Sequence, residues 1–231
     1  MKRNPRPPLK VIMHNEISVD AAMSGFEPNL DLYYQVAETF KADIHLVGSR
    51  TARSGIKTYW GRVPAEEPED FDKPDLKAWD KRPYWVIPDT RGVLKGLLHV
   101  YRKSGYCKDV IVLVTKRTPK AYIQYLQKRH YDHLYCGRDH VDYRQAFVLL
   151  RRRYGATVAM TDSGGTLNNI LLEQGLISEI SLLVAPVLVG DAKANLFRSL
   201  KLGKKKPAFQ LIKNRILEKN YLHLTYRIVV R

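Results

Sequence analysis

Apolar, β-branched runs alternate along the chain with stretches in which apolar residues recur at helical spacing. The extended runs predict strands at residues 10–15, 43–47, 84–87, 110–114, 132–136, 157–161 and 179–185. The helical spacing predicts helices at residues 30–40, 118–129, 142–154 and 167–174. This alternation is typical of an α/β domain with a mostly parallel sheet.

The end of the chain has a different pattern. Two extended segments, residues 209–217 and 221–230, flank Asn220 and predict an antiparallel hairpin. The continuous apolar run Val110–Val114 favours a strand that is buried on both faces. The predicted fold is therefore α/β, with a mostly parallel central sheet, flanking helices and a C-terminal antiparallel hairpin.

Two helix starts can be assigned from their capping residues. Thr118 followed by Pro119 predicts an N-cap with proline at the first helical position. Asp142 with Gln145 three residues later is a variant of the capping box, and it predicts the start of the helix that reaches Tyr154.

A chain of 231 residues is long enough to form one large domain with a substantial core. We predict a single domain over residues 1–231. We predict that residues 1–9 form a flexible basic arm. Residues 59–83 are polar and interrupted by prolines, and we predict that they form a long loop outside the main strands and helices.

The formal net charge of +16 admits nucleic acid, a membrane surface or a phosphorylated small molecule as partner. The cations form separate clusters rather than one stripe, at the N-terminal arm, Lys116-Arg117, Arg151–Arg153 and Lys204–Lys206. No nucleic-acid-binding motif is present, so a solvated basic surface is favoured over a nucleic-acid role.

Cellular location and metal binding follow from what the sequence lacks. No apolar run reaches the roughly 18 residues needed to span a bilayer, and the N-terminus does not have the pattern of a secretory signal. We expect a cytoplasmic protein without a membrane contact.

Cys107 and Cys136 form no Cys-x-x-Cys motif. His130, His133, Cys136 and His140 could be drawn as a metal site, but on a strand His133 and Cys136 point to opposite faces, so no metal is expected.

Ligands of open α/β sheets bind beyond the carboxyl ends of the strands. Three loops at such ends carry groups suited to phosphate: Gly48–Thr51, Val114–Arg117 and Asp162–Asn168. In the third loop, Gly164 and Gly165 precede a helix whose N–H groups could bind a pyrophosphate. The Gly-x-Gly-x-x-Gly and Walker-type motifs are absent, which disfavours a standard Rossmann dehydrogenase or a P-loop ATPase.

A family resemblance rests on these motifs. Asp162-Ser-Gly-Gly-Thr-Leu-Asn168, Gly175–Glu179 and Ala185–Gly190 resemble the reductase of riboflavin biosynthesis, and Ser18-Val-Asp20 resembles that family's Ser-Leu-Asp-Gly loop. In bacteria this reductase is the C-terminal domain of a bifunctional deaminase-reductase. In archaea and fungi it stands alone and acts on a diaminopyrimidinone ribosylamino phosphate. The chain lacks the deaminase's Pro-Cys-x-x-Cys signature.

The resemblance implies a dihydrofolate-reductase-like fold, NADPH as cofactor, a small phosphorylated heterocyclic substrate and a homodimer. The cofactor-binding residues it implies are Ser49, Arg50, Thr51, Thr90, Thr115, Gly164, Gly165, Thr166, Leu167 and Asn168. Arg50 would lie near the 2′-phosphate, which favours NADPH over NADH. The substrate-binding residues are Asn15, Asp20, Asp162 and Pro186.

Asp20 and Asp162 are the candidate catalytic residues, and each could equally be an N-cap or turn residue. Buried, hydrogen-bonded His14 and helix-spaced tyrosines such as Tyr33 are expected to be structural. Ala21 stands where the family usually has glycine and Thr39 where it tends to have arginine, which leaves the substrate open. One alternative is a dihydrofolate-reductase-like enzyme that reduces a pterin or another small carbonyl or imine compound. The other is a basic nucleic-acid-binding α/β protein.

Overall fold

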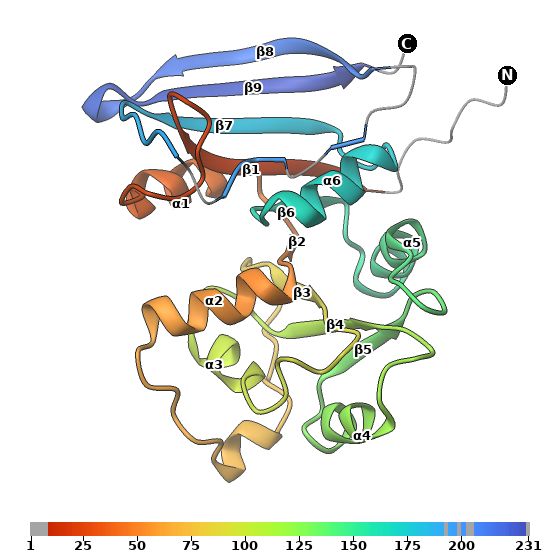
Figure 1. Ribbon diagram of the computed structural model, residues 1–231. Coiled ribbons are helices and arrows are strands. Elements are labelled where there is room, and N and C mark those ends of the chain that lie inside the picture. Colours follow the sequence, from red (N-terminus) through yellow and green to blue (C-terminus); the bar gives the residue numbers. More distant parts are fainter. Residues whose placement is uncertain (1–8, 192–193, 198–199, 202–205, 230–231) are drawn as a thin grey trace, which may run out of the picture. The chain divides into compact units, whose positions relative to one another are not determined.

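A computed structural model describes residues 9–191, 194–197, 200–201 and 206–229, and its secondary structure follows the alternation of strands and helices in the sequence (Figure 1). The chain separates into two compact units. Unit 1 comprises Met1–Ala42 and Thr157–Arg231, and unit 2 comprises Asp43–Ala156. The prediction of one domain over the full length stays a prediction, because this division concerns only compactness.

Unit 1 is built on five strands and two α-helices. Its elements are β1 (Lys10–Ser18), α1 (Leu30–Glu38), β6 (Val158–Thr161), α6 (Gly165–Glu173), β7 (Glu179–Ala185), β8 (Ala208–Ile216), the 3-10 turn η2 (Glu218–Asn220) and β9 (Leu222–Val229). The strand order is β6-β1-β7-β9-β8. β1 runs parallel to β6 and β7, whereas β9 runs antiparallel to β7 and β8. The predicted C-terminal antiparallel hairpin is confirmed.

Unit 2 has four strands, all parallel, in the order β5-β4-β3-β2. Its elements are β2 (Ile44–Leu46), α2 (Ser49–Tyr59), the 3-10 turn η1 (Pro68–Phe71), β3 (Tyr84–Pro88), α3 (Leu98–Lys103), β4 (Val110–Val114), α4 (Lys120–Lys128), β5 (Asp132–Tyr135) and α5 (Tyr143–Tyr154). All five residues of β4 are buried, as their unbroken apolar run predicts. The mostly parallel α/β class is thus confirmed.

Several helix boundaries follow from local hydrogen bonds. The Asn29 side chain accepts from the Leu32 N–H at 3.2 Å and caps α1. The Asp142 side chain accepts from the Gln145 N–H at 2.9 Å, so the predicted cap of α5 is confirmed. The predicted cap of α4 is wrong: that helix begins at Lys120, because the Thr118 hydroxyl instead accepts from the Thr115 N–H at 2.9 Å and closes the turn.

Two helices were missed by the sequence pattern. Ser49–Thr51, taken as part of a loop, is the first turn of α2, which continues to Tyr59. Among the side chains that the structure describes in this helix, Ala52 and Ile56 are buried, and the apolar period was too sparse to detect. The other missed helix, α3, has only six residues.

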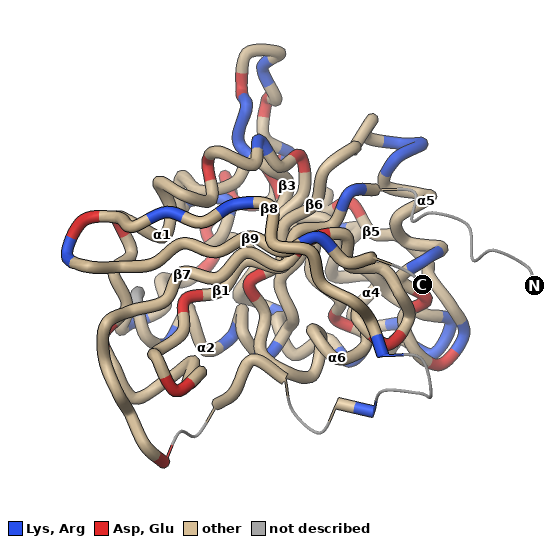
Figure 2. Tube along the Cα trace, turned by 90° about the horizontal axis from the view of Figure 1, so that it is seen from above, with Lys and Arg blue, Asp and Glu red and all other residues tan. Residues whose placement is uncertain are grey.

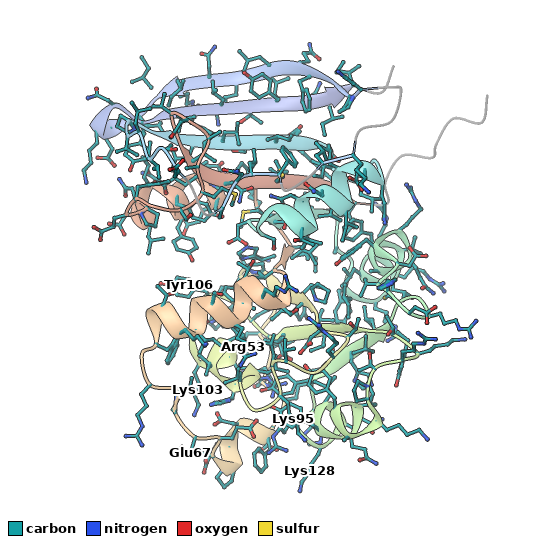
Figure 3. All side chains as sticks on the ribbon, in the orientation of Figure 1. Arg53, Glu67, Lys95, Lys103, Tyr106 and Lys128 are labelled. Atoms are coloured by element: carbon teal, nitrogen blue, oxygen red, sulfur yellow. The ribbon has the colours of Figure 1, made fainter. Side chains whose placement is uncertain are left out.

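Residues 59–83 run outside the strands of unit 2 but are attached to its helices. The Glu66 carboxylate pairs with Arg129 at 2.7 Å and accepts from the Tyr125 hydroxyl at 2.7 Å. Asp70 of η1 pairs with Lys103 of α3 at 2.9 Å. Figure 3 labels Lys103 together with Glu67, the residue before η1, on this part of unit 2. The acidic residues of this segment therefore hold it in place.

The predicted basic arm and one basic cluster fall largely outside the described residues, namely residues 1–8 and Lys204-Lys205. Leu9, which we counted in the arm, is buried. The remaining Lys and Arg positions are distributed over both units and are interspersed with Asp and Glu, as Figure 2 shows. No continuous basic stripe is formed by the residues that Figure 2 colours.

Candidate active site

The carboxyl ends of the parallel strands in unit 1 carry the predicted substrate-side residues. Asn15 lies in the last half of β1, and Asp20 follows that strand. Asp162 follows β6, and Pro186 follows β7. Because β1 is parallel to both β6 and β7, these residues gather at one edge of the sheet of unit 1.

Asn15 connects this edge to helix α6. Its side-chain amide donates to the Asp162 backbone oxygen at 3.1 Å. The Asn168 side-chain amide donates to Asn15 Oδ1 at 3.4 Å and to the Leu196 backbone oxygen at 3.2 Å. Both asparagines are buried. Their hydrogen bonds fix the segment that carries Asp162 relative to the end of β1.

The N-terminus of α6 fits a phosphate group. Gly164 is its N-cap with φ −72° and ψ 174°, and no side chain caps the helix. A Cβ on Gly164 would meet no heavy atom within 4 Å among the described residues. Neither the backbone conformation nor the packing of this chain requires glycine there. The open space in front of Gly164 therefore suits a ligand that approaches the backbone closely.

The other predicted residues of this loop differ in exposure. Thr166 is exposed, whereas the side chains of Leu167 and Asn168 are buried within unit 1. Asn168 is engaged with Asn15 and Leu196, as described above. The side chains of Leu167 and Asn168 thus face the protein interior. Only the backbone N–H groups of these two residues point toward the N-terminal end of α6.

Asp20 holds a turn. Its carboxylate accepts from the Ser18 hydroxyl at 2.5 Å and from the Gly190 N–H at 2.7 Å. These hydrogen bonds, that from Ser18 first, lower the pKa of this exposed carboxyl group. Val19 N–H also donates to the Val187 backbone oxygen at 3.0 Å. The loop after β1 is thereby tied to the loop after β7, which contains the exposed Pro186.

Ala21, which stands where the family usually has glycine, has an unfavourable backbone conformation. Ala21 has φ 62°, in the left-handed region that favours glycine. The glycine that the resemblance expects at this position would therefore suit the backbone better than alanine does. The turn is nevertheless formed, with the Ala22 N–H donating to the Ser18 hydroxyl at 2.9 Å.

Sequence reasoning missed the surroundings of the Asp162 side chain. The hydroxyl of Tyr33, on α1, donates to the His14 backbone oxygen at 3.5 Å, and the charge of the Asp162 carboxyl group adds to a rise in the Tyr33 pKa. The Tyr33 ring stacks on His14 with ring centroids 4.5 Å apart. Burial, as the first cause, raises the pKa of Tyr33 well above its usual value. Only the helical spacing of Tyr33 was visible in the sequence, and that spacing is shared by ordinary core tyrosines.

His14 is buried, as expected, and belongs to a polar chain across three strands of unit 1. Its Nδ1 lies 3.0 Å from the Ser181 hydroxyl, which lies 2.8 Å from Nε2 of His223. Burial lowers the pKa of each histidine to about 4. Among the described residues, His14 Nε2 has no hydrogen-bond partner. Both rings are therefore neutral near pH 7.

In unit 2, the predicted cofactor residues lie beyond three neighbouring parallel strands. Ser49, Arg50 and Thr51 form the first turn of α2 after β2, and Arg50 is exposed. Thr90 follows β3 and is half-buried, and Thr115 follows β4. Because β2, β3 and β4 are neighbours, these residues share one edge of the sheet of unit 2.

Thr115 differs from the others because it is buried. Its N–H donates to the Thr118 hydroxyl at 2.9 Å, and the two hydroxyl oxygens are 3.5 Å apart. Thr115 thus closes the turn before α4, and its predicted cofactor contact stays a prediction.

Within residues 9–191 and the later described segments, no three His, Cys, Asp or Glu side chains gather in a way that could hold a metal ion. His130 Nδ1 lies 2.8 Å from the Phe71 backbone oxygen. None of the helices in the described part of the chain is long and apolar enough to cross a membrane.

The parallel strands of unit 1 end at a buried amide network, a carboxyl group and an uncapped helix that begins with glycine. This is an α/β protein whose candidate site lies beyond its strand ends. The family model described as the RibD C-terminal domain matches residues 9–221. The chain belongs to the RibD C-terminal domain family. The resemblance to the riboflavin-biosynthesis reductases is thereby confirmed over nearly the whole sequence.

Solved structures share this fold. A pyrimidine reductase-like protein from Corynebacterium diphtheriae is 14% identical with a TM-score of 0.68, and the match covers 96% of this chain and 93% of that one. RibD from Acinetobacter baumannii is 18% identical with a TM-score of 0.67, and the match covers 96% of this chain but 58% of that one. Riboflavin biosynthesis reductase Rib7 from Saccharomyces cerevisiae is 16% identical with a TM-score of 0.60, and the match covers 99% of this chain and 93% of that one. A search of curated proteins found no match.

Proposed function

We propose that this protein is an NADPH-dependent reductase of the riboflavin-pathway type. Its reaction would convert the ribosylamino group of a pyrimidine ribosylamino 5′-phosphate into a ribitylamino group. The observation that carries the proposal is the match to the RibD C-terminal domain over residues 9–221. The similar structures include a pyrimidine reductase-like protein and a riboflavin biosynthesis reductase, which supports the same substrate class.

The cofactor assignment is supported by each unit separately. In unit 1, the space in front of Gly164 and the uncapped start of α6 would receive the pyrophosphate through the backbone of Gly165 and Thr166. In unit 2, the exposed Arg50 in the first turn of α2 would bind the 2′-phosphate, with Ser49, Thr51 and Thr90 as further contacts. A guanidinium suits a phosphate monoester, which is why we propose NADPH rather than NADH.

Asp162 is the residue that we assign to the reacting end of the substrate. NADPH, when bound, supplies the hydride for the carbon of the ring-opened sugar imine. The nitrogen then needs one proton, and the Asp162 carboxyl is placed to hold and deliver it. Asn15 fixes the backbone of Asp162 through its 3.1 Å hydrogen bond.

Asp20 receives a different role in this proposal. Its carboxylate already accepts from Ser18, Val189 and Gly190. We therefore assign Asp20 to the shape of the substrate-side loops after β1 and β7, and Asp162 to proton transfer.

We propose a cytoplasmic homodimer, and unit 1 offers a surface for the second copy. Alternate residues of β7 and β9 are half-buried rather than buried, among them Leu182, Val184 and Leu224. On β8, which ends the strand order, Phe209 is 46% and Leu211 is 44% exposed. An apolar sheet face of this kind is typical of an interface. Sedimentation of the purified protein would give a dimer mass if this surface is used.

Calorimetry tests the cofactor assignment. NADPH should bind more tightly than NADH, and Gly165→Asp should abolish binding by placing a negative side chain at the start of α6. Gly164→Ala is the sharper variant, because its Cβ meets open space and its φ of −72° suits alanine. It should leave the unfolding transition unchanged while weakening NADPH binding. Absence of binding by either nucleotide in the unaltered protein would contradict the proposal.

Turnover tests the substrate assignment. Loss of reduced-nicotinamide absorbance should be seen with the pyrimidine ribosylamino 5′-phosphate and not with dihydrofolate. Turnover of dihydrofolate alone would instead identify a pterin reductase.

A further inference from the structure

The side chain of Asn168 joins helix α6 to two other parts of unit 1. It lies in the first turn of the helix and is fully buried. Its NH₂ group carries two hydrogens, and two acceptors face it: Oδ1 of Asn15 on β1 at 3.4 Å and the backbone oxygen of Leu196 at 3.2 Å. We call residues 194–197, to which Leu196 belongs, the bridging segment. One buried amide thus holds the start of α6, strand β1 and the bridging segment together.

The amide of Asn168 can have only this orientation. Both atoms that face its nitrogen are oxygens that accept and cannot donate. With the amide reversed, its own oxygen would face those two oxygens, and both hydrogen bonds would be lost. Asn15 is fixed in the same way, because its nitrogen donates to the Asp162 backbone oxygen at 3.1 Å. Each bond in the chain from Asp162 through the two asparagines to Leu196 therefore has a single direction.

The bridging segment in turn holds the loop after β1. The backbone oxygen of Ala194 accepts from the Met23 N–H at 2.8 Å. Asn195 forms an isolated antiparallel bridge with Ala22, whose side chain is fully buried. This loop carries Asp20, which the proposed function places on the substrate side. The segment that α6 holds through its buried amide is therefore also the segment on which the substrate-side loop rests.

The same loop has other attachments that do not involve the helix. The Ala22 N–H donates to the Ser18 hydroxyl at 2.9 Å. The Val19 N–H donates to the Val187 backbone oxygen at 3.0 Å. These bonds connect the loop to β1 and to the loop after β7. Loss of the helix contact should therefore loosen the Met23 amide and leave the other two amides in place, so the two sets of bonds can be measured separately.

Each end of this connection belongs to a ligand in the proposed function. The first turn of α6 would hold the cofactor pyrophosphate through the backbone of Gly165 and Thr166, and the loop after β1 would line the substrate. A bound pyrophosphate restrains the first turn and with it the Asn168 amide, which lies on that turn. A loop whose support is already ordered loses less entropy when it orders around a second ligand. Cofactor and substrate should therefore favour each other's binding, by the same factor in both directions.

We propose that Asn168 is a positioning residue that couples the cofactor site at α6 to the substrate-side loop after β1. This inference rests on the proposed function for the identity of the two ligands. It also changes the role of Asn168, which the family resemblance implies to be a cofactor contact, because the side chain is buried and acts through Asn15 and Leu196.

Two variants of the full chain remove the connection. Asn168→Leu keeps the branching at Cγ and removes both N–H donors. Asn168→Ala removes the same donors with a smaller side chain, so that the comparison does not depend on the fit of leucine. Ser181→Ala is the matched control. It removes another fully buried polar side chain of unit 1, which lies 3.0 Å from His14 Nδ1 and 2.8 Å from His223 Nε2 and is not part of the chain through Asn168.

The first test is amide hydrogen exchange measured by NMR, which needs no ligand. Once the change in global stability is subtracted, the Met23 amide should exchange about fivefold faster in both Asn168 variants, which corresponds to one net hydrogen bond. The Ala22 and Val19 amides should keep their rates within about twofold, because their acceptors lie outside the bridging segment. Ser181→Ala should leave all three rates unchanged.

The second test measures the coupling by calorimetry. The dissociation constant of the ribitylaminopyrimidine 5′-phosphate product is determined with and without saturating NADP⁺, and the ratio of the two values is the coupling factor. This factor should be about fivefold lower in Asn168→Leu than in the unaltered protein. The dissociation constant of NADP⁺ alone should change by less than about threefold, because the pyrophosphate would bind the backbone of Gly165 and Thr166. Ser181→Ala should leave the coupling factor unchanged.

The outcomes separate the two proposals. If the unaltered protein binds no nicotinamide nucleotide, the proposed function fails, while hydrogen exchange still measures the connection from Asn168 to Met23. If the coupling factor is the same in the folded Asn168 variants as in the unaltered protein, the coupling role is wrong. A lowered thermal transition with equal changes at Met23 and Ala22 would likewise overturn it and assign Asn168 to the stability of unit 1 alone.

Discussion

The two units of this protein use buried polar groups in different ways. In unit 2, charged side chains join surface segments to the helices. Arg102 of α3 is the clearest case: it pairs with Asp109 at 2.8 Å and also donates to the Asp72 and His130 backbone oxygens. In unit 1, neutral side chains form a buried hydrogen-bonded chain inside the sheet, from His14 through Ser181 to His223.

The ion pairs of unit 2 are completed by partners within unit 2, so they contribute to its stability. Buried polar atoms without a hydrogen-bond partner among the residues described occur in both units, such as His14 Nε2 and Asn168 Oδ1 in unit 1 and the Tyr122 and Tyr131 hydroxyls in unit 2. Such atoms are costly to bury, so they do not by themselves mark a functional site. The two in unit 1 lie beside Tyr33 and Asn15, next to the edge that carries Asp162.

The largest expected effect on stability follows from removal of the Arg102 side chain in unit 2. Arg102→Ala should lower the free energy of unfolding by about 3–5 kcal/mol, because it leaves the buried Asp109 carboxylate without its cation. Chemical denaturation measures the loss. Lys73→Ala is the control, since Lys73 pairs with Asp132 while 45% exposed, and it should cost less than about 1 kcal/mol. Equal losses would show that burial does not distinguish these pairs.

Acid should act on unit 1. The pKa of His14 is about 4 in the folded protein and about 6.5 when unfolded. The unfolded chain therefore binds more protons between these values, so stability is fully present above pH 6.5 and falls as the pH approaches 4. The expected loss is about 3 kcal/mol at pH 4.

Denaturation midpoints across this pH range measure the effect of acid. His14→Gln should flatten the dependence, whereas His140→Gln, at an exposed position of unit 2, should leave it unchanged. An identical pH dependence in His14→Gln would contradict the assignment of the acid sensitivity to unit 1.

A glycine pair in unit 2 separates steric clash from backbone strain. Gly137 has a φ of 88° and Gly105 a φ of 79°, so both are in the left-handed region. A Cβ on Gly137 would lie 2.2 Å from the His140 backbone oxygen. A Cβ on Gly105 would meet no described atom within 4 Å. Gly137→Ala should cost about 3 kcal/mol and Gly105→Ala about 1 kcal/mol. Thermal unfolding measures both, and equal costs would rule out the clash.

The smallest effects are two stabilising exchanges, one in each unit. Ala21→Gly in unit 1 relieves the positive φ of 62°, and Gly55→Ala in unit 2 fills open space in helix α2. Each should raise the free energy of unfolding by about 0.5–1 kcal/mol. Gly55→Ala should leave NADPH binding unaltered. A loss of stability in either variant would show that the local backbone is not the controlling factor.

Much of the fold could be predicted from the sequence. Val110–Val114 could be assigned to a buried strand because its apolar run is unbroken, and α5 because Asp142 caps it. Helix α2 could not be found, because its apolar positions, such as the buried Ala52 and Ile56, are too few to give a clear helical period. The cap at Thr118 was misassigned, because its hydroxyl serves Thr115 and not the helix.

The site divides in the same way. Gly164, Gly165 and Asp162 could be proposed from their motif, since a glycine pair before a helix leaves room for a ligand at the backbone. The hydrogen bond between Asn15 and the Asp162 backbone oxygen had no sequence signal, because 147 positions separate the two residues.

The sequence by itself determined the α/β class, the family and the motif at the start of α6, because these depend on local periodicity and on short runs of residues. Only the tertiary structure decided which polar groups meet: Asn15 with the Asp162 backbone oxygen, Asn168 with Asn15, and Ser181 with His14 and His223. The physical reason is that a hydrogen bond depends on distance and direction in space. Strand order and helix packing set those quantities between residues that are remote along the chain.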